Sequence, residues 1–165
     1  YTFIIMFEIK KDILTEEQLK HIQEAVTTDI FPWFYKPKLT HGKSSDGFLF
    51  QHYLYRESNP NSKFYYIIPD YFKKHLDYKA LVLSRINFNL PKKEKVCSRF
   101  HVDETYPCKT ALFYINTTNA TTIFKNGKKV KGIENTLVIF DSMINHKVQF
   151  NTDGKERYVI NFNYF

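Results

Sequence analysis

The residues most able to do chemistry together are two histidines and one aspartate in the second half of the chain. His101 and Asp103 stand two positions apart in RFHVDETYP, and His146 follows in FDSMINHKVQF. Because side chains alternate along a strand, His101 and Asp103 would project from the same face. Two imidazole nitrogens and one carboxylate on one side of a metal leave the opposite positions open, which is the ligand set of non-heme Fe(II) centres. These three residues are the candidate metal ligands.

Arg157 is the fourth candidate, because it begins the apolar segment RYVINFNYF. A guanidinium that points into a core is costly to bury without a partner, and its planar fork suits a carboxylate. Ordinary explanations stay open at this point. The three candidate ligands could be turn or core residues grouped by chance, and Arg157 could lie on an edge strand and pair with Asp141 or Glu156.

The elements that must position these residues predict an α+β domain. Thr15 and Gln18 form a capping box ahead of an amphipathic helix over about residues 16–28, and a second helix is expected with Pro69 just before it and Asp70 as its cap. The pattern then changes to short strands separated by turns: KALVLSRINFNL, VCSRFHVD, KTALFYINTT, TTIFKNGKKVK, NTLVIFD, HKVQF and RYVINFNYF. Helices followed by antiparallel strands predict a β-sandwich or jelly roll.

Length and composition favour one folded domain. The chain has 165 residues, of which 43% are hydrophobic and 18% aromatic, which excludes a disordered chain. Cys97 and Cys108 are too few for a disulfide scaffold and favour a reducing, cytoplasmic setting. The apolar start YTFIIMF soon meets charge, so it predicts a strand and neither a signal segment nor a membrane span. No membrane partner is expected.

The net charge of +7 permits an anionic partner. The lysines are scattered, which is typical of a solvated basic surface, and nucleic acid stays open as an alternative partner. The four other histidines lack a carboxylate at ligand spacing and are expected to be structural or surface residues: His21, His41, His52 and His75.

From Lys79 to Phe165 the sequence resembles the Fe(II)/2-oxoglutarate-dependent oxygenases, in particular small prolyl-4-hydroxylase-like members of phages and other microbes. The resemblance rests on FHVD, TALFYINTT, NTLVIFDSMINH and ERYVINFNY, in the family's order. It implies a double-stranded β-helix (jelly-roll, cupin-like) core with N-terminal helices packed on one sheet. A single domain over residues 1–165 is expected, with residues 1–78 as the support and substrate-loop region and residues 79–165 as the core that carries the metal site.

The resemblance also implies roles for individual residues. His101, Asp103 and His146 would bind Fe(II), and Arg157 would bind the distal carboxylate of 2-oxoglutarate. Tyr114 stands where a tyrosine hydroxyl binds the same carboxylate.

A further polar contact to the co-substrate is assigned to Asn87, which shares a strand face with Arg85 and Asn89 by alternation. The chain departs from the family where Ala120 replaces a glycine, where Thr122 is expected to keep the role of the family's threonine, and where Val159 lacks a hydroxyl.

The activity implied is hydroxylation of a C–H bond with O2 and 2-oxoglutarate as co-substrates, releasing succinate and CO2. A protein or peptide residue such as proline is the expected substrate. The alternatives are a nucleic-acid-modifying oxygenase with the same centre and a non-catalytic β-sandwich binding module. The aromatic segment FPWFYKP (31–37) is expected either to cover the helices as core or to form a lid over the substrate. The many Lys, Asn, Ile, Phe and Tyr residues favour a phage or marine-microbial source, expressed in a host cytoplasm.

Overall fold

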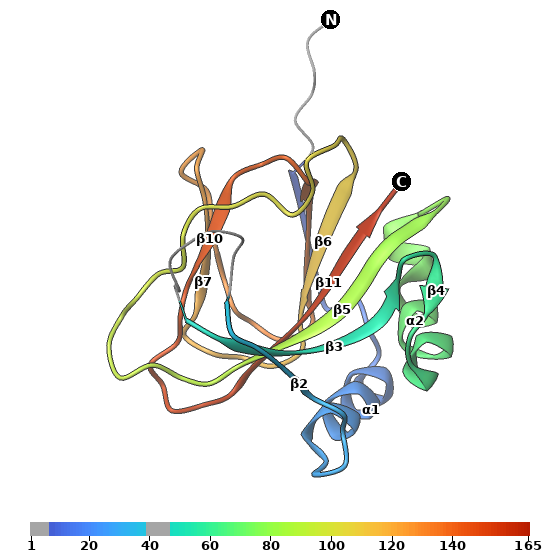
Figure 1. Ribbon diagram of the computed structural model, residues 1–165, viewed down its shortest axis with the longest axis horizontal. Coiled ribbons are helices and arrows are strands. Elements are labelled where there is room, and N and C mark those ends of the chain that lie inside the picture. The colour runs from blue at the N-terminus through green and yellow to red at the C-terminus, as the bar shows by residue number, and fades with distance from the viewer. Residues whose placement is uncertain (1–6, 39–46) are drawn as a thin grey trace, which may run out of the picture.

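The computed structural model describes residues 7–38 and 47–165, and its strands form two antiparallel sheets (Figure 1). The major sheet has the order β1-β9-β6-β11-β5-β3-β2, with β4 paired to β3, and the minor sheet has the order β10-β7-β8. The major sheet consists of β1 (Phe7–Lys11), β2 (Phe34–Lys36), β3 (Leu49–Arg56), β4 (Asn59–Pro60), β5 (Leu81–Asn89), β6 (Lys109–Tyr114), β9 (Thr136–Asp141) and β11 (Arg157–Tyr164). The minor sheet consists of β7 (Thr121–Phe124), β8 (Lys129–Lys131) and β10 (His146–Gln149).

The helices α1 (Glu16–Thr27) and α2 (Ile68–Leu76), with the short 3-10 helix η1 (Lys63–Tyr66), lie together at one side of the major sheet (Figure 1). The expected capping box starts α1, because Thr15 Oγ1 accepts a hydrogen bond from the Gln18 amide at 3.2 Å and Gln18 Oε1 accepts one from the Thr15 amide at 3.1 Å.

The expected start of the second helix was wrong. Helix α2 already begins at Ile68, so Pro69 and Asp70 both lie in its first turn. Proline is tolerated there because the first amide groups of a helix have no intrahelical acceptor. Asp70 Oδ1 instead forms an ion pair with Lys73 Nζ at 2.6 Å.

Strand β11 shows how the major sheet serves two purposes, since all eight of its residues are buried. Its alternate side chains Tyr158, Ile160, Phe162 and Tyr164 belong to the core on the helix side. Val159 belongs to the second core, which lies between the two sheets. One face of the sheet therefore packs on the helices, and the other faces the minor sheet.

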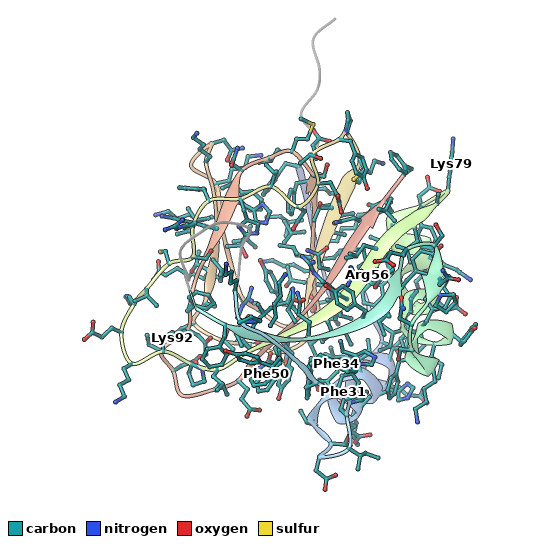
Figure 2. The ribbon with its side chains drawn as sticks, in the orientation of Figure 1. Phe31, Phe34, Phe50, Arg56, Lys79 and Lys92 are labelled. Carbon is teal, nitrogen blue, oxygen red and sulfur yellow. The ribbon has the colours of Figure 1, made fainter. Side chains whose placement is uncertain are left out.

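The two cores account for most of the apolar burial. The helix-side core includes Ile22, Phe72, Ile86 and Phe113. Figure 2 shows side chains occupying the space between the sheets, where the second core consists of Leu112, Tyr114, Phe124, Val130, Val138, Phe140 and Val159. This two-sheet arrangement, with the helices on one sheet, is the expected jelly roll. No helix in the described ranges is both long and apolar enough to cross a membrane.

The segment around FHVD was expected to be a strand but forms only two isolated bridges. Cys97 pairs with Gln149, and His101 pairs with His146, both antiparallel. The backbone is tied to the edge of the minor sheet at these points. The expected convergence of His101 and Asp103 consequently depends on local loop geometry and not on a regular strand.

Candidate metal centre

The three candidate ligands come together at one end of β10. The ligand atoms of His101, Asp103 and His146 all lie within 4.8 Å of one another. Reciprocal backbone hydrogen bonds of 2.9 Å join His101 to His146, and the Asp103 amide donates to the carbonyl of Ser142 at 3.2 Å. The long loop and the strand edge are therefore held in register at the ligands themselves.

Each histidine is oriented by a backbone carbonyl two residues earlier. His101 Nδ1 lies 3.2 Å from the carbonyl oxygen of Arg99, and His146 Nδ1 lies 3.0 Å from that of Ile144. Because a carbonyl only accepts hydrogen bonds, each Nδ1 carries the proton and each Nε2 keeps a free lone pair. Burial, and to a smaller extent the neighbouring His146, lower the pKa of His101, and Asp103 opposes this. The lowered pKa favours the neutral imidazole that a metal requires.

Asp103 has one oxygen held by the protein and one aimed at His146. Oδ1 accepts a hydrogen bond from Asn161 Nδ2 at 3.4 Å and lies 3.8 Å from Arg85 Nη2. Oδ2 lies 3.7 Å from His146 Nε2 and has no hydrogen-bond donor among the described residues, although the carboxylate is 2% exposed. A buried carboxylate oxygen requires a donor or a cation. The orphaned Oδ2 and the two imidazole nitrogens fit a divalent metal ion.

A cavity of about 90 Å³ opens beside the three ligands, which is several times the space that one water molecule needs. It is lined by Leu49, Gln51, Arg85, Asn87, Asn89, Ser98, His101, Asp103, Leu112, Thr122, His146, Lys147, Val148, Phe150, Arg157, Val159 and Asn161. The major sheet contributes residues from β3, β5, β6 and β11. The sheet face away from the helices is therefore the face that builds the site.

Arg157 lies in this cavity and is 7% exposed. Its Nη1 donates to Asn89 Oδ1 at 3.3 Å, and its buried Nε has no acceptor in residues 7–38 and 47–165. Over the same residues it forms no ion pair, and Glu156 instead accepts a hydrogen bond of 2.6 Å from the hydroxyl of Tyr158. Burial lowers the pKa of Arg157. A buried guanidinium that lacks a carboxylate partner fits an anionic ligand.

Tyr114 and Asn87 lie at the cavity in different ways. The Tyr114 ring lies 5.9 Å from the Arg157 guanidinium, and its hydroxyl is 2.7 Å from Thr122 Oγ1. Thr122 lines the cavity, whereas Tyr114 is buried behind it. Asn87 lines the cavity directly, and its Oδ1 accepts from Gln51 Nε2 at 2.9 Å.

The sequence did not identify Gln51, Asn161 or Lys147 as site residues. Asn161 was detectable in principle, because it lies four residues after Arg157 on the same face of β11. Gln51 lies on β3, which only the fold brings to the cavity, and Lys147 directly follows the candidate ligand His146 on β10. The remaining described histidines lie away from the cavity, as expected, and His41 lies outside the described residues: His21 is on α1, His52 is buried on β3 and His75 is on α2.

The aromatic segment at 31–35 divides between two environments. Phe31 is buried in the helix-side core, with Trp33 packed against it, and Figure 2 shows Phe31 beside α1. Phe34 and Tyr35 on β2 are 62% and 61% exposed. The segment therefore supplies core at its start and exposed aromatic surface at its end.

Comparison with protein-family models and with curated protein sequences finds no match. Solved structures do match. A prolyl-4-hydroxylase from Pseudomonas putida has a TM-score of 0.63 at 13% identity, covering 98% of this chain and 93% of that chain. A prolyl hydroxylase from Trichoplax adhaerens, solved with a peptide fragment of the hypoxia inducible factor oxygen degradation domain, has a TM-score of 0.65 at 17% identity, covering 96% and 83%.

The non-heme α-ketoglutarate-dependent epimerase SnoN from nogalamycin biosynthesis has a TM-score of 0.68 at 10% identity, covering 96% of this chain and 77% of that chain. At such low identities these likenesses concern the fold. The chain has the jelly-roll fold of the Fe(II)/2-oxoglutarate oxygenases, and the solved structures that match it include prolyl hydroxylases.

Proposed function

We propose that this protein is an Fe(II)- and 2-oxoglutarate-dependent dioxygenase, a single domain over residues 1–165, that hydroxylates a C–H bond and releases succinate and CO2. The observation that carries the proposal is a single cavity with two complementary sites. One holds two imidazole nitrogens and an orphaned carboxylate oxygen. The other holds a buried guanidinium without a carboxylate partner in the described residues.

The metal ligands in this proposal are His101 Nε2, His146 Nε2 and Asp103 Oδ2. Fe(II), when bound with 2-oxoglutarate and O2, supplies the oxidising power for hydroxylation. The protein contributes a fixed ligand geometry, because backbone carbonyls hold both Nδ1 atoms and Asn161 holds Asp103 Oδ1. Such outer contacts orient the ligands before the metal arrives.

Arg157 is assigned to the distal carboxylate of 2-oxoglutarate. It lies four residues before Asn161 on the same face of β11, which places the two Cα atoms about 13 Å apart. A short dicarboxylate can occupy the space between the metal ligands and the guanidinium. Asn89 orients the Arg157 guanidinium, and the Tyr114 ring with the Thr122 hydroxyl forms the floor beside it.

The substrate that the site supports best is a protein or peptide residue such as proline. The Trichoplax prolyl hydroxylase with this fold was solved with a bound peptide fragment. Here the cavity is lined by the amide side chains of Gln51, Asn87, Asn89 and Asn161, which can both donate to and accept from peptide groups. Asn87 is assigned as a donor to co-substrate or substrate, because Gln51 engages its oxygen and leaves its NH2 group.

The test is an anaerobic titration of the metal-free protein with Fe(II) and then with 2-oxoglutarate, followed by visible absorption of the chelate. A band should form in the wild type and disappear in His146→Ala. His21→Ala is the matched control, because His21 lies on α1, away from the cavity, and it should behave as the wild type. No band in the wild type, with no binding of metal or 2-oxoglutarate by calorimetry, would refute the proposal and favour a binding module.

A further inference from the structure

The function proposed above gives Arg85 no role with the co-substrate, yet Arg85 lines the same cavity. It lies on β5, in register with Asn161 of β11 and Tyr53 of β3. Its side chain is 20% exposed, and its closest acidic atom is Asp103 Oδ1 at 3.8 Å from Nη2, which is longer than a hydrogen bond. Its buried Nε has no acceptor in the described part of the chain. Among the described residues, the guanidinium thus has this long ion pair with Asp103, and its Nε donor is unused.

The cavity wall carries an excess of positive charge. Among the described residues that line it, Asp103 is the one carboxylate, against Arg85, Arg157 and Lys147. In the proposed complex, the charges of Fe(II), Asp103, 2-oxoglutarate and Arg157 cancel. The charge of Arg85 is then left without compensation beside the position where the substrate must approach the metal.

Lys36 is a further positive charge on the cavity face of the major sheet, in the row of strand residues that contains Arg157. It lies on β2 opposite Leu49, a residue of the cavity wall, and directly paired residues share a sheet face. Burial lowers the pKa of Lys36, and repulsion from Arg85 and from Arg56 lowers it further. Bringing like charges together is unfavourable for the empty site, and a bound anion between them would reverse that.

We propose that Arg85 binds a carboxylate of the substrate beside the metal ligands, so that the substrate is an acidic peptide. The planar guanidinium matches a carboxylate, and the amide-lined wall suits the neighbouring peptide groups. This inference rests on the proposed function. It adds the charge and the chemical class of the substrate.

The experiment uses the full chain loaded with redox-inert Zn(II) and 2-oxoglutarate, so that Arg157 already has its carboxylate. Three probes are titrated by calorimetry and by side-chain NMR of the arginines. N-acetylaspartate amide offers a side-chain carboxylate, N-acetylglycine offers a terminal carboxylate, and N-acetylasparagine amide is the neutral analogue of the first. At least one carboxylate probe should bind about tenfold or more tightly than the neutral probe, and the tighter one identifies the source of the carboxylate.

Arg85→Gln should remove this preference, and Arg85→Lys should keep part of it. Lys20→Gln is the control, because Lys20 lies on α1, where it is paired with Glu24 at 3.7 Å, and its loss changes the net charge equally. A preference that persists in Arg85→Gln, or falls equally in Lys20→Gln, overturns the proposal. So does a Zn(II) affinity that falls in Arg85→Gln while the preference persists, since Arg85 would then only position Asp103.

The two proposals fail in different ways. If the wild type binds neither Zn(II) nor 2-oxoglutarate, the proposed function is refuted, and the carboxylate site falls with it. If it binds both and shows no preference for a carboxylate, the carboxylate site alone is refuted.

Discussion

Replacing Arg157 with methionine should separate the cost of a buried charge from its use. Arg157 is 7% exposed and forms no ion pair in the described residues. Within residues 7–38 and 47–165, the one side-chain hydrogen bond of its guanidinium goes to Asn89 Oδ1 at 3.3 Å. Methionine is apolar, reaches as far as the Nε of arginine and adapts to irregular cavities. Arg157→Met therefore removes the charge with little change in packing.

The stability of the ligand-free protein should rise or change little. Replacing buried charge by apolar side chains of similar volume is often neutral or stabilising by about 1–4 kcal/mol. The lost hydrogen bond to Asn89 costs about 1 kcal/mol. The net change then lies between a loss of about 1 kcal/mol and a gain of about 3 kcal/mol, and for a chain of this size each kcal/mol shifts Tm by about 2–4 °C.

The affinity for 2-oxoglutarate should change in the opposite direction. Truncating one partner of a buried, hydrogen-bonded charge pair costs about 2–5 kcal/mol, and each 1.4 kcal/mol is about tenfold in binding. The Kd should therefore rise at least about 30-fold. Metal affinity should change little, because Arg157 contacts none of the three ligands in the described structure.

Calorimetric melting of the metal-free protein and titration of the Zn(II) form with 2-oxoglutarate measure the two effects. Asn89→Leu is a useful comparison, because it removes the hydrogen bond but keeps the guanidinium. A Tm for Arg157→Met several degrees below the wild type, together with an unchanged Kd for 2-oxoglutarate, would refute the reasoning. Arg157 would then be a structural residue that needs no external carboxylate.

Three further predictions follow from local contacts. Asn161→Leu should weaken metal binding about 10–100-fold, because Asn161 Nδ2 holds Asp103 Oδ1, and an unchanged metal affinity in chelator competition would exclude that role. Thr15→Ala should lower the free energy of unfolding by about 1 kcal/mol, because it removes the cap of α1. Urea unfolding measures this change, and no change would mean that tertiary contacts alone hold the helix end. Burial lowers the pKa of His52, whose Nε2 is 2.7 Å from Ser62 Oγ. The contribution of neutral His52 to the free energy of unfolding should be fully present above about pH 6.5, the ordinary histidine value. It should be lost as the pH falls through the lower folded-state pKa. His52→Gln should flatten this decline, and an equally steep decline in that variant would assign it to other groups.

The types of the elements were readable from the sequence because their causes are local. The capping box at Thr15 and the helical spacing of Ile22 and Val26 act within one or two turns, and both are present in α1. The apolar run RYVINFNYF likewise predicted β11, whose even-numbered residues belong to the helix-side core, while Val159 belongs to the second core. Pro69 and Asp70 suit either a helix that starts after them or a helix that contains them in its first turn, and there the start of the helix was misplaced.

The candidate ligands were also suggested by residue type and order, but their convergence is a tertiary property. His101 and Asp103 lie on an irregular loop, and reciprocal hydrogen bonds with β10 bring them to His146. No alternation rule describes that loop, because its backbone lacks a regular ladder. The sequence named residue types suited to a metal, and pairing between distant segments decided that their ligand atoms lie within 4.8 Å.

The charge balance of the cavity depended largely on the fold. From the sequence, alternation put Arg85 on the strand face of Asn87, but Lys36 was one basic residue among a net charge of +7. The order of β11, β5, β3 and β2 in one sheet places both on the cavity side of the major sheet. Side-chain chemistry is thus set residue by residue along the chain, whereas which charges share a cavity is set by strand pairing, because only pairing brings residues far apart in sequence onto one face.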